Sequence, residues 1–197
     1  MIFDDKNFVK ELNEKLKQGA VVSFVTDTVW GVGCLPDNEK GVENIYELKN
    51  RDRSKPLILM SDSVEHLLPY VKEIPQKAHK LMEQHFPGDL TLIFEKSDKT
   101  PEFVTSFKNT VGIRVPDNKV FKRFCEVVDG HVLATTSANL SGQDAASTYD
   151  EAVKNVGEHV AYVFEDYGCH CEGRASTVAL ALDDDIKVLR QGEVVLE

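Results

Sequence analysis

Residues 49–55, KNRDRSK, hold four basic side chains and one acidic one, a local charge of +3 in a chain whose formal net charge is −10. Guanidinium groups bind phosphate oxygens bidentately, and lysine supplies a point charge. The run could therefore receive a polyanion. It also follows a predicted helix, where cations interact favourably with the carbonyl end without any ligand. Both interpretations stay open for this segment alone.

Two hydroxyl-rich segments favour a binding site. Residues 135–142, TTSANLSG, directly follow the apolar strand HVLA, and residues 26–28, TDT, end another apolar strand. Such strand ends are where open α/β sheets bind ligands, although the same residues also form caps and turns. Arg114 and Arg190 each lie at or near a strand end. Together these groups predict a cleft for a polyanion and a small polar ligand.

Several familiar motifs are absent from the sequence. There is no G-x-x-x-x-G-K-[ST] and no H-E-x-x-H, and Gly31-Val32-Gly33 lacks the third glycine of a dinucleotide fingerprint. No serine–histidine or cysteine–histidine pair indicates a side-chain nucleophile. Cys169-His170-Cys171 has zinc-binding groups but no fourth ligand at a recognisable spacing, so we expect a surface loop and no metal site there. With no nucleophile indicated, the polar and basic residues are suited to positioning substrates and stabilising charge, which is how enzymes accelerate transfer at phosphorus.

Composition limits the class of protein. The chain has 197 residues, 42% of them hydrophobic and 28% charged, and four scattered cysteines that we expect to be reduced. A net charge of −10 argues against broad adhesion to nucleic acid, because that affinity comes from Lys and Arg. The charged N-terminus is unlike a secretory signal, and no apolar run is long enough for a membrane helix. We therefore expect a soluble, cytoplasmic protein.

The apolar patterning predicts elements that interleave irregularly. Helices are expected over 4–18, 38–48, 63–71, 74–86, 118–128 and 148–156, and strands over 20–25, 57–60, 91–96, 111–115, 131–136, 161–166, 176–182 and 186–190. Residues 31–38, GVGCLPDN, are expected to be a turn-rich connection. This order predicts an α/β fold, a single domain over 1–197 with a twisted mixed sheet and helices on its outer side.

In this order the segments resemble the YrdC family, the threonylcarbamoyl-AMP synthases that serve tRNA modification. The family's K-x-R and S-x-N signatures are matched by Lys49-Asn50-Arg51 and Ser137-Ala138-Asn139. The resemblance runs from about Ala20 to Gly192 and includes TDTVWGVG, FPGDLTLIF, VGIRVP, TSANLSG and VLRQG. Val25, Trp30 and Met60 depart from the family's usual proline, tyrosine and, in some members, histidine. The resemblance implies a twisted sheet with a concave, positively charged face.

The resemblance also implies a reaction. The amine of L-threonine takes up bicarbonate or CO₂, and the resulting carbamate attacks the α-phosphorus of ATP. Pyrophosphate leaves, with Mg²⁺ sharing the phosphate charge, and threonylcarbamoyl-adenylate remains. The chain would thus be a nucleotidyltransferase, and partner proteins would pass the carbamoyl group to tRNA.

Residue roles follow from matching positions in the family. The resemblance assigns Lys49 and Arg51 to catalysis. It assigns ATP binding to Lys49, Arg51, Lys55, Ser137, Asn139 and Arg190. It assigns threonine binding to Thr26, Thr110, Arg114 and Ser176.

Two alternatives to the synthase remain at this point. The family has also been described as binding double-stranded RNA through its concave face, so a non-catalytic RNA-binding module is one. The other is a related carbamoyl-handling enzyme that uses a different amino acid or acceptor.

Overall fold

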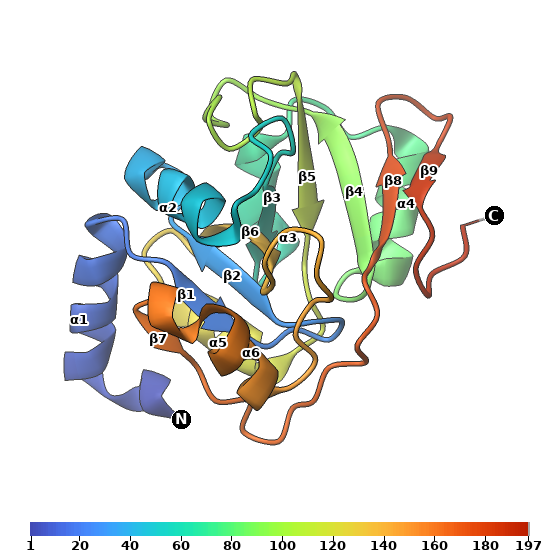
Figure 1. The fold of residues 1–197 in the computed structure, drawn as a ribbon. Helices are drawn as coiled ribbons and strands as arrows, with labels where there is room; N and C mark the ends of the chain where they lie inside the picture. The colour runs from blue at the N-terminus through green and yellow to red at the C-terminus, as the bar shows by residue number, and fades with distance from the viewer. Residues whose placement is uncertain (197) are drawn as a thin grey trace.

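A computed structural model describes residues 1–196, and within them nine strands form one sheet in the order β7-β1-β2-β6-β3-β5-β4-β8-β9 (Figure 1). Parallel and antiparallel neighbours alternate irregularly across it. For example, β3 pairs with β5 in parallel and with β6 antiparallel. The expected mixed α/β sheet is confirmed. The expectation of one domain over 1–197, whose last residue lies outside the described residues, stays a prediction.

The described strands are β1 (Val22–Phe24), β2 (Gly31–Cys34), β3 (Ile58–Ser61), β4 (Leu90–Glu95), β5 (Thr110–Arg114), β6 (Val132–Ser137), β7 (Tyr162–Val163), β8 (Thr177–Leu180) and β9 (Lys187–Arg190). The α-helices are α1 (Lys6–Lys17), α2 (Glu39–Lys49), α3 (Val64–Leu67), α4 (Gln76–His85), α5 (Lys119–Val127) and α6 (Tyr149–Val156). Three 3₁₀ turns complete this part of the chain, η1 (Ile2–Asp4), η2 (Leu68–Tyr70) and η3 (Gly157–His159). Among residues 1–196, no helix has the length and apolar character needed to cross a membrane.

Local sequence accounts for where the helices begin. Asp5 precedes α1 and its carboxylate accepts hydrogen bonds from two backbone N–H groups of the first turn. The Asn38 side chain accepts one such hydrogen bond at the start of α2, and the Asn118 side chain accepts two at the start of α5. Leu12 and Leu16 then bury the inner face of α1, as the four-residue spacing predicts.

Residues 31–34 contradict the sequence-based expectation. The segment is not part of a turn-rich connection but the strand β2, paired with both β1 and β6. Both glycines of this strand pack against the ring of Phe24. A Cβ atom added to Gly31 would come within 2.8 Å of that ring. Glycine here leaves room for the Phe24 side chain and is not a turn signal.

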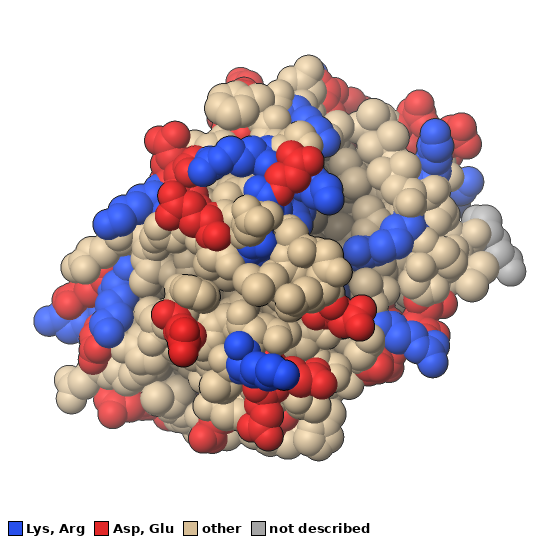
Figure 2. All heavy atoms as spheres, in the orientation of Figure 1, with Lys and Arg blue, Asp and Glu red and all other residues tan. Residues whose placement is uncertain are grey.

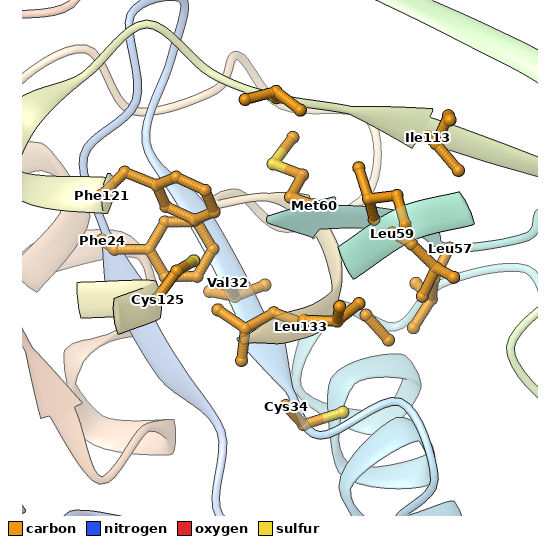
Figure 3. Close-up of a cluster of buried hydrophobic side chains, with 14 of the residues drawn as sticks. Phe24, Val32, Cys34, Leu57, Leu59, Met60, Ile113, Phe121, Cys125 and Leu133 are labelled. Atoms are coloured by element: carbon orange, nitrogen blue, oxygen red, sulfur yellow. The ribbon is translucent and has the colours of Figure 1, made fainter. Parts of the chain in front are cut away.

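The two faces of the sheet differ in character. Strand register places Leu59 beside Ile113 on one face, where both side chains are part of the hydrophobic core (Figure 3). The neighbouring pair, Met60 beside Arg114, lies on the opposite face because strand side chains alternate. Part of that second face is covered by α5, where Phe24 contacts Phe121. The uncovered part carries the cavity described next.

Candidate functional site

A cavity of about 390 Å³ opens over β3, β4, β5, β6 and β8. Its walls include strand residues that share one face of the sheet, together with the loops after β1 and β6 and the end of β9. The polar residues that line it are Thr26, Thr28, Arg51, Thr91, Arg114, Thr135, Thr136, Ser137, Asn139, Gln143, Asp144, Ser176 and Arg190. Three arginines and one aspartate are among them, so the wall is cationic in an acidic chain. Figure 2 shows basic side chains gathered around a hollow on this face.

The end of α2 aims the cationic segment at the cavity. Asn50 ends the helix in the left-handed conformation, with φ 46°, which asparagine tolerates better than most residues. The following Arg51 donates hydrogen bonds from Nε to the Lys55 backbone oxygen and from Nη2 to that of Pro56. These contacts fix the guanidinium, whose Nη1 makes no hydrogen bond within the described residues. Arg53 instead points elsewhere and pairs with Glu43.

Lys49 lies behind the cavity wall. Its side chain is 1% exposed, and Nζ donates hydrogen bonds to the backbone oxygens of Ser137 and Asn139 and to Asn139 Oδ1. Ser137 Oγ donates to the same Oδ1 at 2.6 Å. Burial, and to a smaller extent the charge of Arg51, lowers the pKa of Lys49 to about 7. When Lys49 is protonated, its ammonium group holds the loop after β6 in place, so that Ser137 and Asn139 of this loop face the cavity.

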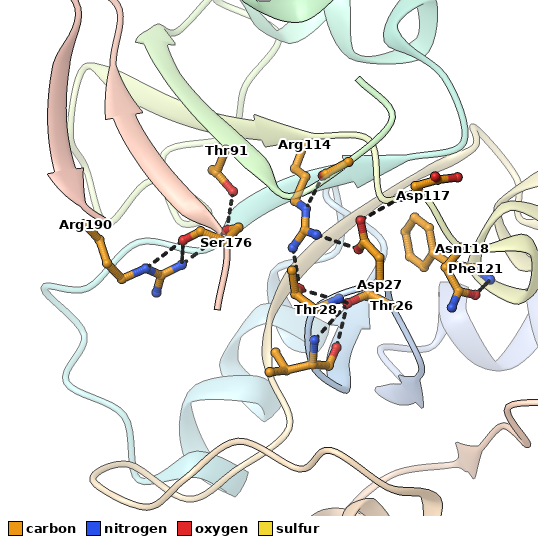
Figure 4. Close-up of polar contacts among 12 residues, drawn as sticks. Thr26, Asp27, Thr28, Thr91, Arg114, Asp117, Asn118, Phe121, Ser176 and Arg190 are labelled. Carbon is orange, nitrogen blue, oxygen red and sulfur yellow. Dashed lines mark hydrogen bonds and ion pairs between the residues drawn. The ribbon is translucent and has the colours of Figure 1, made fainter. Parts of the chain in front are cut away.

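Arg114 forms the base of the opposite wall (Figure 4). It is 2% exposed and donates to Thr28 Oγ1 at 2.7 Å, to Asp27 Oδ1 at 2.5 Å and to the Gly88 backbone oxygen at 2.9 Å. Burial lowers the pKa of Arg114, and the Asp27 carboxylate opposes that effect. Asp27 Oδ2 also accepts from the backbone N–H of Asp117. The TDT segment is therefore tied to the end of β5 by a buried ion pair.

Arg190 and Ser176 bring the C-terminal strands to the same cavity. Arg190 donates from Nε and Nη2 to the Ser176 backbone oxygen and from Nη2 to Ser176 Oγ at 3.2 Å. Ser176 Oγ also lies 2.9 Å from Thr91 Oγ1. Burial lowers the pKa of Arg190, and the charge of Arg114 adds to this effect. Two guanidinium groups thus face one cavity close enough to repel, an arrangement that favours an anion between them.

The side chain of Thr26 makes its hydrogen bonds within its own turn. Its hydroxyl donates to the Val29 backbone oxygen at 2.6 Å and accepts from the backbone N–H groups of Thr28 and Val29. The turn thereby presents Thr28 to Arg114 and leaves Thr26 buried in the cavity wall.

The structure brings most of the predicted site residues together. Arg51, Ser137, Asn139, Arg190, Thr26, Arg114 and Ser176 all line the one cavity. Three others are not in its lining: Lys49 lies behind the loop, Lys55 is exposed beyond Arg51, and Thr110 lies at the far end of β5. Their assigned roles stay predictions.

The sequence does not single out two residues of the site, Thr91 in the cavity lining and Asp27, which holds Arg114. Thr91 lies within the quoted segment FPGDLTLIF, but an isolated threonine in a strand carries no signal of its own. In the sequence Asp27 is only the middle residue of TDT, and its pairing with Arg114 depends on a contact across 87 residues. Neither role can be seen without the strand register.

The fold and the cavity together define a class of protein. A curved mixed sheet presents three arginines, several hydroxyls and an amide to one cavity, so the chain is an α/β protein whose cavity is suited to an anionic ligand beside a small polar one.

Comparisons with known proteins narrow this class to a family. The Sua5/YciO/YrdC family model, described as "Telomere recombination", matches residues 14–192. The threonylcarbamoyl-AMP synthase of Vibrio campbellii is 33% identical over 189 residues, which is 95% of this chain and 100% of that protein. This chain belongs to the Sua5/YciO/YrdC family.

Solved structures agree with that assignment. The crystal structure of P. abyssi Sua5 complexed with L-threonine superposes with a TM-score of 0.87 at 28% identity, covering 95% of this chain and 55% of that one. The present chain therefore spans just over half of that protein. E. coli YciO, at 23% identity and a TM-score of 0.85, covers 98% of this chain and 93% of its own and shows the same fold.

Proposed function

We propose that this protein is an L-threonylcarbamoyladenylate synthase, which makes threonylcarbamoyl-AMP and pyrophosphate from ATP, L-threonine and bicarbonate. The observation that carries the proposal is that one cavity is lined by residues from both predicted sets, those for ATP and those for threonine. The family relatives named threonylcarbamoyl-AMP synthase and the L-threonine complex of P. abyssi Sua5 support the same activity.

ATP is proposed to bind along the loop after β6. Ser137 and Asn139 line this side of the cavity: the Asn139 amide is fixed by the Leu140 and Gln143 backbone oxygens, and the Ser137 hydroxyl oxygen can accept a hydrogen bond from the nucleotide. Arg51 offers a guanidinium already fixed by two backbone oxygens. Arg190 faces them from β9. A guanidinium held in place before the substrate arrives needs little reorganisation as charge develops on the phosphates.

Threonine is proposed to bind on the side of the cavity formed by Arg114, Thr26 and Ser176. Arg114 supplies the positive charge that an amino-acid carboxylate needs in a buried place. The Arg190–Ser176 contact joins this side to the nucleotide side. The two substrates would thus lie next to each other, as a direct transfer between them requires.

The proposed reaction balances without a covalent enzyme intermediate. The threonine amine and bicarbonate give a carbamate and water, a carbamate oxygen forms a bond to the α-phosphorus, and the bond to the pyrophosphate oxygen breaks. Arg51 and Arg190 then stabilise the leaving group's negative charge. Mg²⁺ would enter bound to ATP oxygens, since it prefers oxygen ligands and the cavity lining offers one carboxylate, Asp144.

The test is pyrophosphate release by the purified protein. Release should need ATP, Mg²⁺, L-threonine and bicarbonate together, and it should stop when EDTA removes Mg²⁺. Pyrophosphate release that does not depend on threonine would contradict the proposal. So would the absence of release when all four components are present. A panel of amino acids would separate this enzyme from a carbamoyl-handling paralogue with another substrate.

Partners beyond the substrates are proposals of the same kind. Transfer proteins in the cytoplasm would move the threonylcarbamoyl group of the adenylate to tRNA and release AMP. A direct contact with double-stranded RNA would appear as binding that weakens steeply with salt and persists when ATP and threonine are saturating.

A further inference from the structure

A second cluster of reactive side chains lies away from the substrate cavity, where β3 ends and β6 begins. Asp62 follows β3, His66 lies on α3, and His131 immediately precedes β6. The cluster and Ser137 are at opposite ends of β6, about 20 Å apart by the rise of a strand. It is therefore separate from the proposed site of catalysis.

The ligand atoms of the cluster converge. His66 Nδ1 lies 2.9 Å from Asp62 Oδ1, and His131 Nδ1 lies 3.5 Å from Asp62 Oδ2. All three residues offer a ligand atom within 4.8 Å of the others. Two ligands on one tetrahedral zinc ion, each about 2.0–2.1 Å from the metal, are about 3.3 Å apart. The observed separations bracket this value.

One of these atoms has no hydrogen-bond partner. Within residues 1–196, His131 Nδ1 is the buried side-chain nitrogen or oxygen left unsatisfied. It faces the Asp62 carboxylate at 3.5 Å without a hydrogen bond. A buried polar atom without a partner is costly and calls for an unseen ligand, ion or water. A metal ion between Nδ1 and Oδ2 would satisfy both atoms.

The surrounding structure holds the cluster together. Ser61 Oγ donates to the His131 backbone oxygen at 2.7 Å and to Asp62 Oδ1 at 3.0 Å. The two imidazole rings stack with centroids 4.3 Å apart. Both histidine side chains are 37% exposed, whereas Asp62 is 10% exposed. The carboxylate is thus anchored, and the rings can turn to meet an ion that arrives from solvent.

We propose that Asp62, His66 and His131 bind one divalent transition-metal ion, with Zn²⁺ as the representative. Two imidazoles and one carboxylate suit zinc, nickel or copper, whereas magnesium prefers oxygen ligands alone. Water from the exposed side completes the coordination. The ion connects the start of α3 to the start of β6, and its role is structural.

The proposal is tested by calorimetric titration of the full chain with ZnSO₄. The wild-type protein should bind one Zn²⁺ that excess Mg²⁺ does not displace. His66→Ala and His131→Asn should each weaken that binding at least tenfold. Asparagine suits position 131 because His131 has φ 61°, which asparagine tolerates. The control His79→Gln, on the exposed face of α4, should bind as the wild type does.

The thiols of Cys169 and Cys171 are the competing ligands. A Cys169→Ser/Cys171→Ser variant should keep the same Zn²⁺ binding. If that variant loses the ion, if both histidine variants keep it, or if the wild type binds none, the proposal is wrong. Circular dichroism without metal checks folding, and should His131→Asn fail to fold, His66→Ala decides alone because its side chain is partly exposed.

Discussion

Lys49 at the end of α2 and Asn139 after β6 are joined by two hydrogen bonds, from Nζ to the backbone oxygen at 2.5 Å and to Oδ1 at 2.9 Å. The residues are 90 positions apart in the chain. The K-x-R and S-x-N signatures are therefore in direct contact. Lys49 positions the loop after β6, and Asn139 in that loop lines the cavity.

Arg51 should matter far more than its neighbour Arg53. Arg51→Ala should lower the rate of pyrophosphate release about 10²–10³-fold, because it removes a preorganised charged donor from the cavity wall. Arg53→Ala is the matched control, since its guanidinium pairs with Glu43 and is 59% exposed. The two rates are compared at saturating ATP and threonine. Equal rates would show that the cationic run is only a solvated helix end.

The buried Lys49 should make stability depend on pH. Its pKa falls from an ordinary 10.5 to about 7 on folding, so between these values the unfolded chain binds more protons than the folded one. The free energy of unfolding should therefore rise with pH from about 7 towards 10.5 through this group. Urea unfolding of the wild type and Lys49→Met at pH 6.5 to 9.5 measures it. A constant difference between the two would mean that the three oxygen acceptors keep the ammonium charged.

The Arg114–Asp27 pair should be costly to break from one side. Arg114→Met leaves the largely buried Asp27 carboxylate without its partner and should destabilise the fold by about 3–5 kcal/mol. Asp27→Asn combined with Arg114→Met should cost less than the sum of the single changes. Denaturant unfolding of the four proteins gives the coupling energy. Additive losses would contradict a coupled pair.

Gly192 should be needed to place Ser176 and Arg190. A Cβ at position 192 would come within 2.5 Å of the Ala175 oxygen and the Thr177 nitrogen, both backbone atoms that cannot easily move. Gly192→Ala should destabilise the fold by about 1–3 kcal/mol and raise the KM for threonine. Gly157→Ala is the control, because its nearest neighbour would be a side-chain atom at 3.4 Å. If the KM for threonine is unchanged in Gly192→Ala, this glycine is not needed to place the residues of the site.

Local pattern predicted much of the fold, and long-range pairing explains what it missed. The spacing of Leu12 and Leu16 identified α1 because one helix face is decided by nearby residues. Gly31 and Gly33 resemble a turn signal in the sequence, because the strand they form depends on Phe24 and on β6, which local sequence cannot show. For the same reason the 161–166 strand is only the two-residue β7.

The candidate site shows the same division. Motif resemblance identified Arg51, Ser137 and Arg190, which do converge on one cavity. It did not show that Lys49 lies behind the wall, because burial depends on how the loop after β6 covers α2. Only the three-dimensional packing therefore distinguishes Arg51, which lines the cavity, from Lys49, which positions the loop of the cavity wall.

A crystal structure of the protein with L-threonine and a non-hydrolysable ATP analogue tests the central claim most directly. The account predicts the phosphates between Arg51 and Arg190, beside Ser137 and Asn139, with the threonine carboxylate at Arg114. A nucleotide bound elsewhere, with this cavity empty of both ligands, would contradict it.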